Sequence, residues 1–89
     1  NPININATNI KSTQIFVLGP FVTVGTQIVN LIPDASCDGV EIIVYNHNNL
    51  AGTGTQINYP SSSINPVVGK AVKFVYINSV GVMIPFLST

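Results

Sequence analysis

The sequence predicts an all-β domain, and three observations support this prediction. Val and Ile occur twelve times each and Thr seven times among 89 residues, and these β-branched residues favour the pleated surface of a sheet. Turn residues cut the chain into short apolar runs, as in all-β proteins. No apolar stripe of helical period lasts three turns without Gly, Pro or Asn. We expect one domain over residues 1–89, a small antiparallel β-sandwich or barrel of about seven to eight short strands.

The first third of the chain contains four candidate strands. Ile3, Ile5 and Ala7 alternate with polar residues, which is the period of a half-buried strand. Three further runs each end at a Gly or a Pro, and these are residues 14–18, 21–24 and 27–32. Such punctuation marks the ends of strands.

Residues 40–46 are the strongest candidate for a central strand. A polar turn over residues 33–39 precedes them, and its closing Asp38-Gly39 pair suits a positive φ. Ile42, Ile43 and Val44 are apolar at successive positions. Both faces of this strand should therefore be covered.

The second half of the chain adds three strands between polar loops. The long loop 46–54 precedes a short run, residues 56–59, and a second loop covers residues 61–66. Residues 71–78 and 82–86 flank a tight hairpin turn. Pro85 cannot donate a ladder hydrogen bond, so the last strand should lie at a sheet edge or end there. The expected core includes four residues of the central strands, namely Ile42, Val44, Phe74 and Tyr76.

Composition excludes several classes of function. Only three Lys and three acidic residues are present, and the net charge is zero, so nucleic acid has no basic stripe to bind. No apolar run approaches the roughly 20 residues of a membrane-spanning helix, and we expect no membrane insertion. With 46% hydrophobic residues, the chain has apolar surface to bury between protomers. We expect a homotrimer of about 28 kDa, three chains of 9.4 kDa each.

The ionisable residues do not form a recognisable catalytic or metal-binding pattern. Cys37 and His47 are the single thiol and the single imidazole, and the extended run between them should separate their side chains by some 20–30 Å. Asp34, Asp38 and Glu41 could hold a hard cation, although a solvated acidic turn is the simpler interpretation. We therefore predict no enzyme activity, no catalytic residue, no metal and no cofactor. An ion on the axis of a trimer stays an open alternative.

The uncharged polar loops are the remaining candidates for a functional site. Eleven Asn residues are present, and amide groups beside aromatic rings suit the hydroxyls of neutral sugars. The candidate ligand-binding residues lie in or beside the two longest loops: Tyr45, Asn46, His47, Asn48, Asn49 and Tyr59. The alternative is that Asn simply tolerates turn geometry there.

Two segments resemble domains of phage tail fibres. In the first, Val29-Asn30-Leu31-Ile32-Pro33-Asp34-Ala35-Ser36 is followed by Asp38-Gly39-Val40-Glu41-Ile42-Ile43-Val44-Tyr45-Asn46. In the second, residues 69–78 followed by Val80-Gly81-Val82 are similar to the closing hairpin of those domains. The resemblance covers roughly residues 27–86, and Val82 and Met83 stand where those domains often have an aromatic residue. It implies a C-terminal knob of three chains at the distal end of a fibre, on a phage or on a bacterial trimeric adhesive protein.

We therefore expect a non-enzymatic, receptor-binding tip of a trimeric fibre, the last domain of a longer chain. It would belong to a virion tail fibre or to an extracellular, cell-surface fibre, and its receptor would be a cell-surface glycan. One alternative is a structural trimerisation module without a ligand of its own. Another is a carbohydrate-binding module, against which the absence of Trp counts, since such modules usually offer aromatic platforms.

Overall fold

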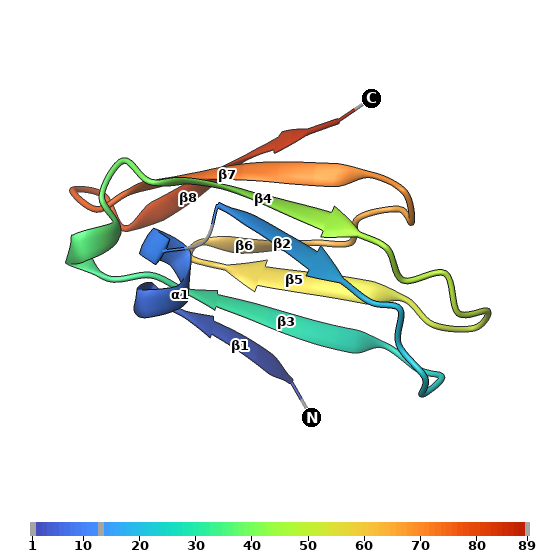
Figure 1. Cartoon of the computed structure of the whole chain (residues 1–89). Coiled ribbons are helices and arrows are strands. Elements are labelled where there is room, and N and C mark those ends of the chain that lie inside the picture. The colour runs from blue at the N-terminus through green and yellow to red at the C-terminus, as the bar shows by residue number, and fades with distance from the viewer. Residues whose placement is uncertain (1, 13, 89) are drawn as a thin grey trace.

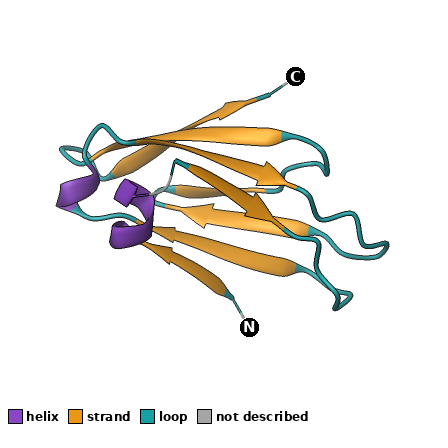
Figure 2. Cartoon of the chain, in the orientation of Figure 1, coloured by secondary structure: helices purple, strands orange, loops and turns teal. Residues whose placement is uncertain are grey.

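The computed structural model describes residues 2–12 and 14–88, which form a sandwich of two four-stranded sheets (Figures 1 and 2). Sheet A has the strand order β1-β3-β5-β6, with the bounds Ile3–Asn6, Gln27–Ile32, Thr55–Tyr59 and Ser62–Ile64. Sheet B has the order β2-β4-β7-β8, with the bounds Ile15–Leu18, Glu41–Asn46, Ala71–Ile77 and Val82–Leu87. Two short helical segments complete the fold, α1 over Ala7–Ser12 and the 3₁₀ turn η1 over Ala35–Cys37.

The chain crosses from one sheet to the other after each of the first four strands. Strands β1, β3 and β5 therefore run parallel in sheet A, and β2 runs parallel to β4 in sheet B. The antiparallel pairs are β4–β7 and β7–β8 in sheet B and β5–β6 in sheet A. The β-sandwich prediction is confirmed, but the prediction of a purely antiparallel arrangement is wrong. Successive strands alternate between the two sheets, so the chain reverses direction twice before it returns to the same sheet. The returning strand therefore runs parallel to the earlier one.

Helix α1 replaces the end of the first predicted strand. The side-chain oxygen of Asn6 accepts a hydrogen bond from the Asn9 N–H at 3.4 Å, as an N-cap residue does. Ile10 is fully buried, so tertiary packing outweighs the weak helix propensity of this segment. No helix among the described residues is long and apolar enough to cross a membrane.

Two other segments also differ from the expected elements. Residues 21–24 contain bends and no strand. Phe21 packs against the core, whereas Val22 is 95% exposed. Strand β6 lies inside the loop expected at residues 61–66 and pairs with β5. The predicted positive φ of Gly39 is confirmed, at +77°. Strand β8, which contains Pro85, lies at the edge of sheet B as expected.

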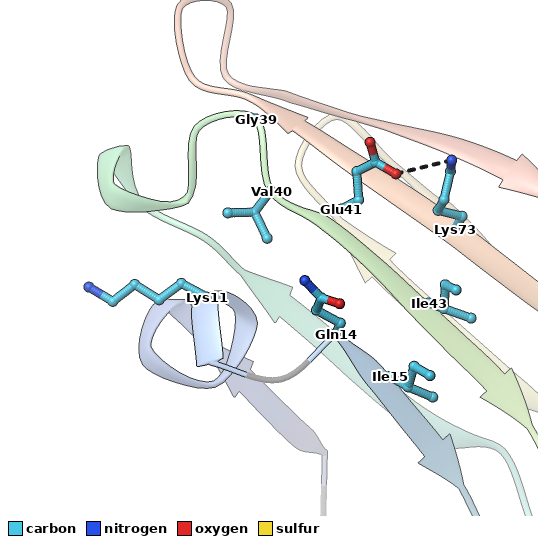
Figure 3. A pocket seen from close by; sticks show the side chains of 8 residues that line it. All are labelled: Lys11, Gln14, Ile15, Gly39, Val40, Glu41, Ile43 and Lys73. Atoms are coloured by element: carbon cyan, nitrogen blue, oxygen red, sulfur yellow. Dashed lines mark ion pairs between the residues drawn. The ribbon is translucent and has the colours of Figure 1, made fainter.

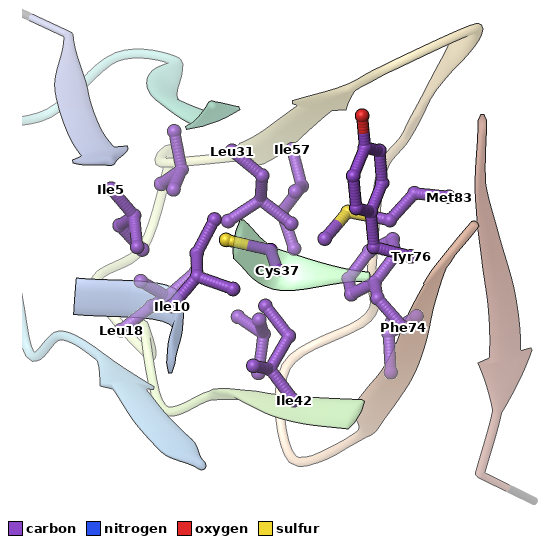
Figure 4. Close-up of a cluster of buried hydrophobic side chains, with 13 residues drawn as sticks. Ile5, Ile10, Leu18, Leu31, Cys37, Ile42, Ile57, Phe74, Tyr76 and Met83 are labelled. Carbon is purple, nitrogen blue, oxygen red and sulfur yellow. The ribbon is translucent and has the colours of Figure 1, made fainter. Parts of the chain in front are cut away.

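The core fills the space between the two sheets (Figure 4). Ile42, Val44, Phe74 and Tyr76 are all buried there, which confirms the prediction made for them. Sheet A supplies the opposing layer, and α1 and η1 close one end of the sandwich. The buried side chains from sheet A and from these two segments include Ile5, Val29, Leu31, Ile57, Ile10 and Cys37.

Candidate functional site

The candidate loop lies at the end of the sandwich opposite α1 and η1. Strand β4 ends at Asn46, and the loop that follows crosses to β5 (Figure 1). The His47 N–H donates to the Leu18 carbonyl at 2.8 Å, and the Gly69 N–H donates to the Asn46 carbonyl at 2.8 Å. The start of the loop is therefore held between the end of β2 and the connection that precedes β7.

Asn46 and Asn48 build the inside of this loop. Their exposed fractions are only 3% and 4%. The Asn46 side-chain amide donates to the Pro66 carbonyl at 2.9 Å, and its oxygen accepts from the Asn48 N–H at 3.0 Å. The Asn48 amide donates to the hydroxyl of Thr55, itself buried, at 3.2 Å. The Asn48 Oδ1 atom has no hydrogen-bond partner but is buried. These two side chains therefore shape the loop and expose no polar group to a ligand in this conformation.

Tyr45, His47 and Asn49 are the accessible part of the predicted site. Asn49 and His47 are exposed, and Tyr45 is half-buried. The rings of Tyr45 and His47 are stacked, with centroids 6.0 Å apart and an interplanar angle of 23°. An aromatic face beside amide groups is the kind of surface that binds sugar rings. The ligand-binding role of these three residues stays a prediction.

Tyr59 does not join this group. It is the last residue of β5, whose first residue, Thr55, lies beside Asn48. Four residues of an extended strand span about 13 Å, so Tyr59 lies towards the other end of the sandwich. Its ring packs against Phe74, with the centroids 5.1 Å apart. The structure therefore gives Tyr59 a packing role beside the core.

A row of amide side chains crosses the outer face of sheet A, and the sequence analysis did not identify it. Asn4, Asn30 and Asn58 are register partners on the parallel strands β1, β3 and β5. The Asn30 amide donates to Asn4 at 3.0 Å, and the Asn58 amide donates to Asn30 at 2.9 Å. In the sequence, each of these Asn residues stands between two large apolar or aromatic residues, and this repeated pattern could have predicted the row.

A hollow of about 460 Å³ lies between α1 and sheet B (Figure 3). Its single ion pair joins Lys73 Nζ to Glu41 Oε1 at 3.1 Å, and both side chains are about half exposed. Aliphatic side chains and one amide make up most of the remaining lining, which comprises Lys11, Gln14, Ile15, Gly39, Val40 and Ile43. Lys73 and Glu41 neutralise each other, and the lining contains no Ser, Thr, Cys or His side chain.

Each of the three acidic side chains has a different partner within the chain. Asp34 accepts hydrogen bonds from the hydroxyl and the N–H of Ser36, and these bonds lower the pKa of its carboxyl. Asp38 accepts from the Asn78 N–H at 2.9 Å, and Glu41 pairs with Lys73. Within residues 2–12 and 14–88, no three His, Cys, Asp or Glu side chains are placed to hold a metal ion.

The site is therefore small and neutral, with two stacked rings and one amide exposed at the end of a loop that buried amides hold in place. No known protein family, no curated protein sequence and no solved structure matches the chain.

Proposed function

We propose that the chain is a non-enzymatic, receptor-binding tip of a homotrimeric fibre, on a virion or a cell surface, and that its ligand is a neutral glycan. The observation that supports this most directly is the stacked pair of Tyr45 and His47 beside the exposed Asn49. An aromatic pair offers a face to a sugar ring, and the amide can both donate to and accept from hydroxyl groups. Both rings are free of the core.

The scaffold of this loop supports a binding role. The bonds of Asn46 and Asn48 to Pro66 and Thr55 fix the backbone from inside. A loop that is already ordered loses little conformational entropy when it binds. Three copies around an axis would add avidity to individually weak contacts.

Binding of the wild-type chain to an array of neutral glycans tests the proposal. His47→Ala and Asn49→Ala should each weaken the binding that the wild type shows. Asn9→Ala is the matched control, because Asn9 is also an exposed Asn but lies on α1 at the opposite end of the sandwich. Binding that both loop variants retain in full would place the ligand elsewhere. A wild-type chain that binds no glycan would contradict the glycan part of the proposal.

The second candidate function is a structural trimerisation module without a ligand. It is favoured by the outer surface of sheet B, where Ile15, Val17 and Phe86 are each at least half exposed. Glycan binding separates the two candidates, because the structural module would associate without binding any sugar on the array.

A further inference from the structure

The outer surface of sheet B is apolar across all four strands, and we call it the outer B face. On β2, Ile15 and Val17 are both 60% exposed. They are the register partners of Ile43 and Tyr45 on β4, and Ile43 is 37% exposed. Neighbouring side chains on one face of a sheet pack into a continuous surface, so Ile15, Val17 and Ile43 form one patch. Tyr45 of the candidate site lies at the end of this patch, next to the loop.

Strands β7 and β8 extend the patch to the other edge of the sheet. Phe86 and Ile84 are 51% and 38% exposed, and they pair with Lys73 and Val75 of β7. Lys73 interrupts the apolar surface, but its Nζ lies 3.1 Å from Glu41 and 5.4 Å from the centre of the Phe86 ring. Glu41 thus neutralises the ammonium group of Lys73 on the outer B face, and the aliphatic part of the Lys73 side chain covers apolar surface.

The outer face of sheet A is different. Its central row consists of Asn4, Asn30 and Asn58, joined by side-chain hydrogen bonds. The outer face of sheet A therefore has a central row of amides with Ile28 and Ile32 beside it, whereas aliphatic and aromatic side chains dominate the outer B face. The low charge of the sequence does not by itself explain this asymmetry, because both faces are built from neutral residues.

The sequence of β4 indicates that the outer B face is covered. Ile42 and Val44 point into the core, whereas Ile43 between them points outwards. A strand that is apolar on both sides is typical of a sheet with both faces buried. In the single chain only one face of β4 is buried.

We infer that the outer B face is the surface through which copies of this chain associate. The inference deepens the proposed function and rests on it for the number of copies. Further copies of the chain suit the face because Glu41 and Lys73 leave it with no net charge, so three copies can bring it together around a threefold axis without repulsion. A strongly acidic or basic partner would find no opposite charge to bind.

The size of the face is consistent with an interface that also uses its rim. The face is four strands wide, at about 4.8 Å per strand, and about six residues long, at about 3.3 Å per residue. Its flat area is therefore roughly 380 Å². The largest apolar patch on a typical monomer is about 300–600 Å² and is often functional. A standard interface takes roughly 800 Å² from each partner, so the contact should extend beyond the strands towards α1. The hollow there already includes Ile15, Ile43 and Lys73 of the face (Figure 3).

Two isoleucines offer a matched test. Ile43 and Ile28 are both 37% exposed and both lie on inner strands, Ile43 on the outer B face and Ile28 on the outer face of sheet A. Ile43→Glu places a carboxylate directly opposite Lys73, which favours the folded chain but puts a charge in the interface. Ile28→Glu makes the same change on the other face.

Mass from light scattering, with circular dichroism to confirm folding, gives the result. We expect about 28 kDa (three chains of 9.4 kDa) for the wild type and for Ile28→Glu, and a threefold lower mass for Ile43→Glu. An unchanged mass for Ile43→Glu would overturn the inference and leave the proposed trimer intact. A wild-type monomer would overturn both. If Ile43→Glu does not fold, the mass of Phe86→Ser, on the edge strand β8, replaces it: a threefold lower mass supports the inference and an unchanged mass overturns it.

Discussion

The side-chain amide of Asn58 donates to the side-chain oxygen of Asn30 at 2.9 Å, and the two residues are register partners on neighbouring parallel strands. Asn30 in turn donates to Asn4 at 3.0 Å. Each amide thus has the same orientation as the next, because parallel strands in register repeat the same geometry. The row links three strands that are far apart in the sequence.

Asn30→Ala should destabilise the fold, because Asn30 is the middle residue of the row and takes part in both of its hydrogen bonds. A net contribution of about 1 kcal/mol per hydrogen bond, reduced by partial exposure, gives an expected loss of about 1–2 kcal/mol. Urea unfolding at a fixed protein concentration measures it. Ser63→Ala is the control, since Ser63 pairs with Asn58 but is exposed. Equal stabilities of the two variants would contradict the prediction.

Truncation in the core should have a larger effect. Ile42 and Phe74 are fully buried register partners on the central strands of sheet B. We expect Ile42→Ala and Phe74→Ala each to reduce the free energy of unfolding by about 2–5 kcal/mol, because each removes buried apolar surface and leaves a cavity. The same denaturant titration applies. Ile28→Ala, on the outer face of sheet A, should cost far less, and a comparable loss there would mean that burial does not set the effect.

The sequence predicted most strands and their core-facing residues, because period-two burial leaves a local signal. The bounds of β3 matched the prediction, and β4 and β7 matched to within one residue at each end. The parallel pairing of β1, β3 and β5 could not be predicted in this way. It depends on which sheet each strand joins, and alternation is the same in either case.

The candidate site was predicted less well for a related reason. The sequence places Asn46, His47, Asn48 and Asn49 together in a loop, but it does not show which side chains turn inwards. Asn46 and Asn48 are buried because Pro66 and Thr55, from other parts of the chain, supply their partners. These contacts follow from tertiary structure alone.

The stability of the η1 turn should decrease in acid. Hydrogen bonds from the Ser36 hydroxyl and then from its N–H lower the pKa of Asp34. A carboxyl with a lower pKa in the folded state stabilises that state above its unfolded pKa of about 3.9. This contribution is lost as the pH falls through the folded pKa.

Ser36→Ala removes the larger of these two causes. The fall in Tm below about pH 4 should therefore be shallower in Ser36→Ala than in the wild type, and shallower again in Asp34→Asn. Thermal unfolding across this acid range measures it, with Ser63→Ala as a control that keeps the wild-type profile. Parallel profiles for the wild type and Ser36→Ala would show that this carboxyl does not contribute.

Gly19 should tolerate a side chain less well than Gly39, although both have a positive φ, +96° and +77°. Alanine at either position carries a backbone penalty of about 1–2 kcal/mol. At Gly19 a Cβ would also lie 3.0 Å from the Asn48 Cα and 3.1 Å from the His47 carbonyl oxygen, whereas at Gly39 it would meet no atom within 4 Å. Both of those contacts are backbone atoms, so the loop itself would have to shift.

Gly19→Ala should therefore lower the free energy of unfolding more than Gly39→Ala, and the close approach contributes to the difference between the two. Urea unfolding of both variants measures it. Because the shift falls on the backbone of His47 and Asn48, Gly19→Ala should also weaken any glycan binding by the wild type, while Gly39→Ala leaves it unchanged. Equal losses of stability would mean that the 47–49 loop gives way freely, and that it is not the rigid support which the buried Asn46 and Asn48 indicate.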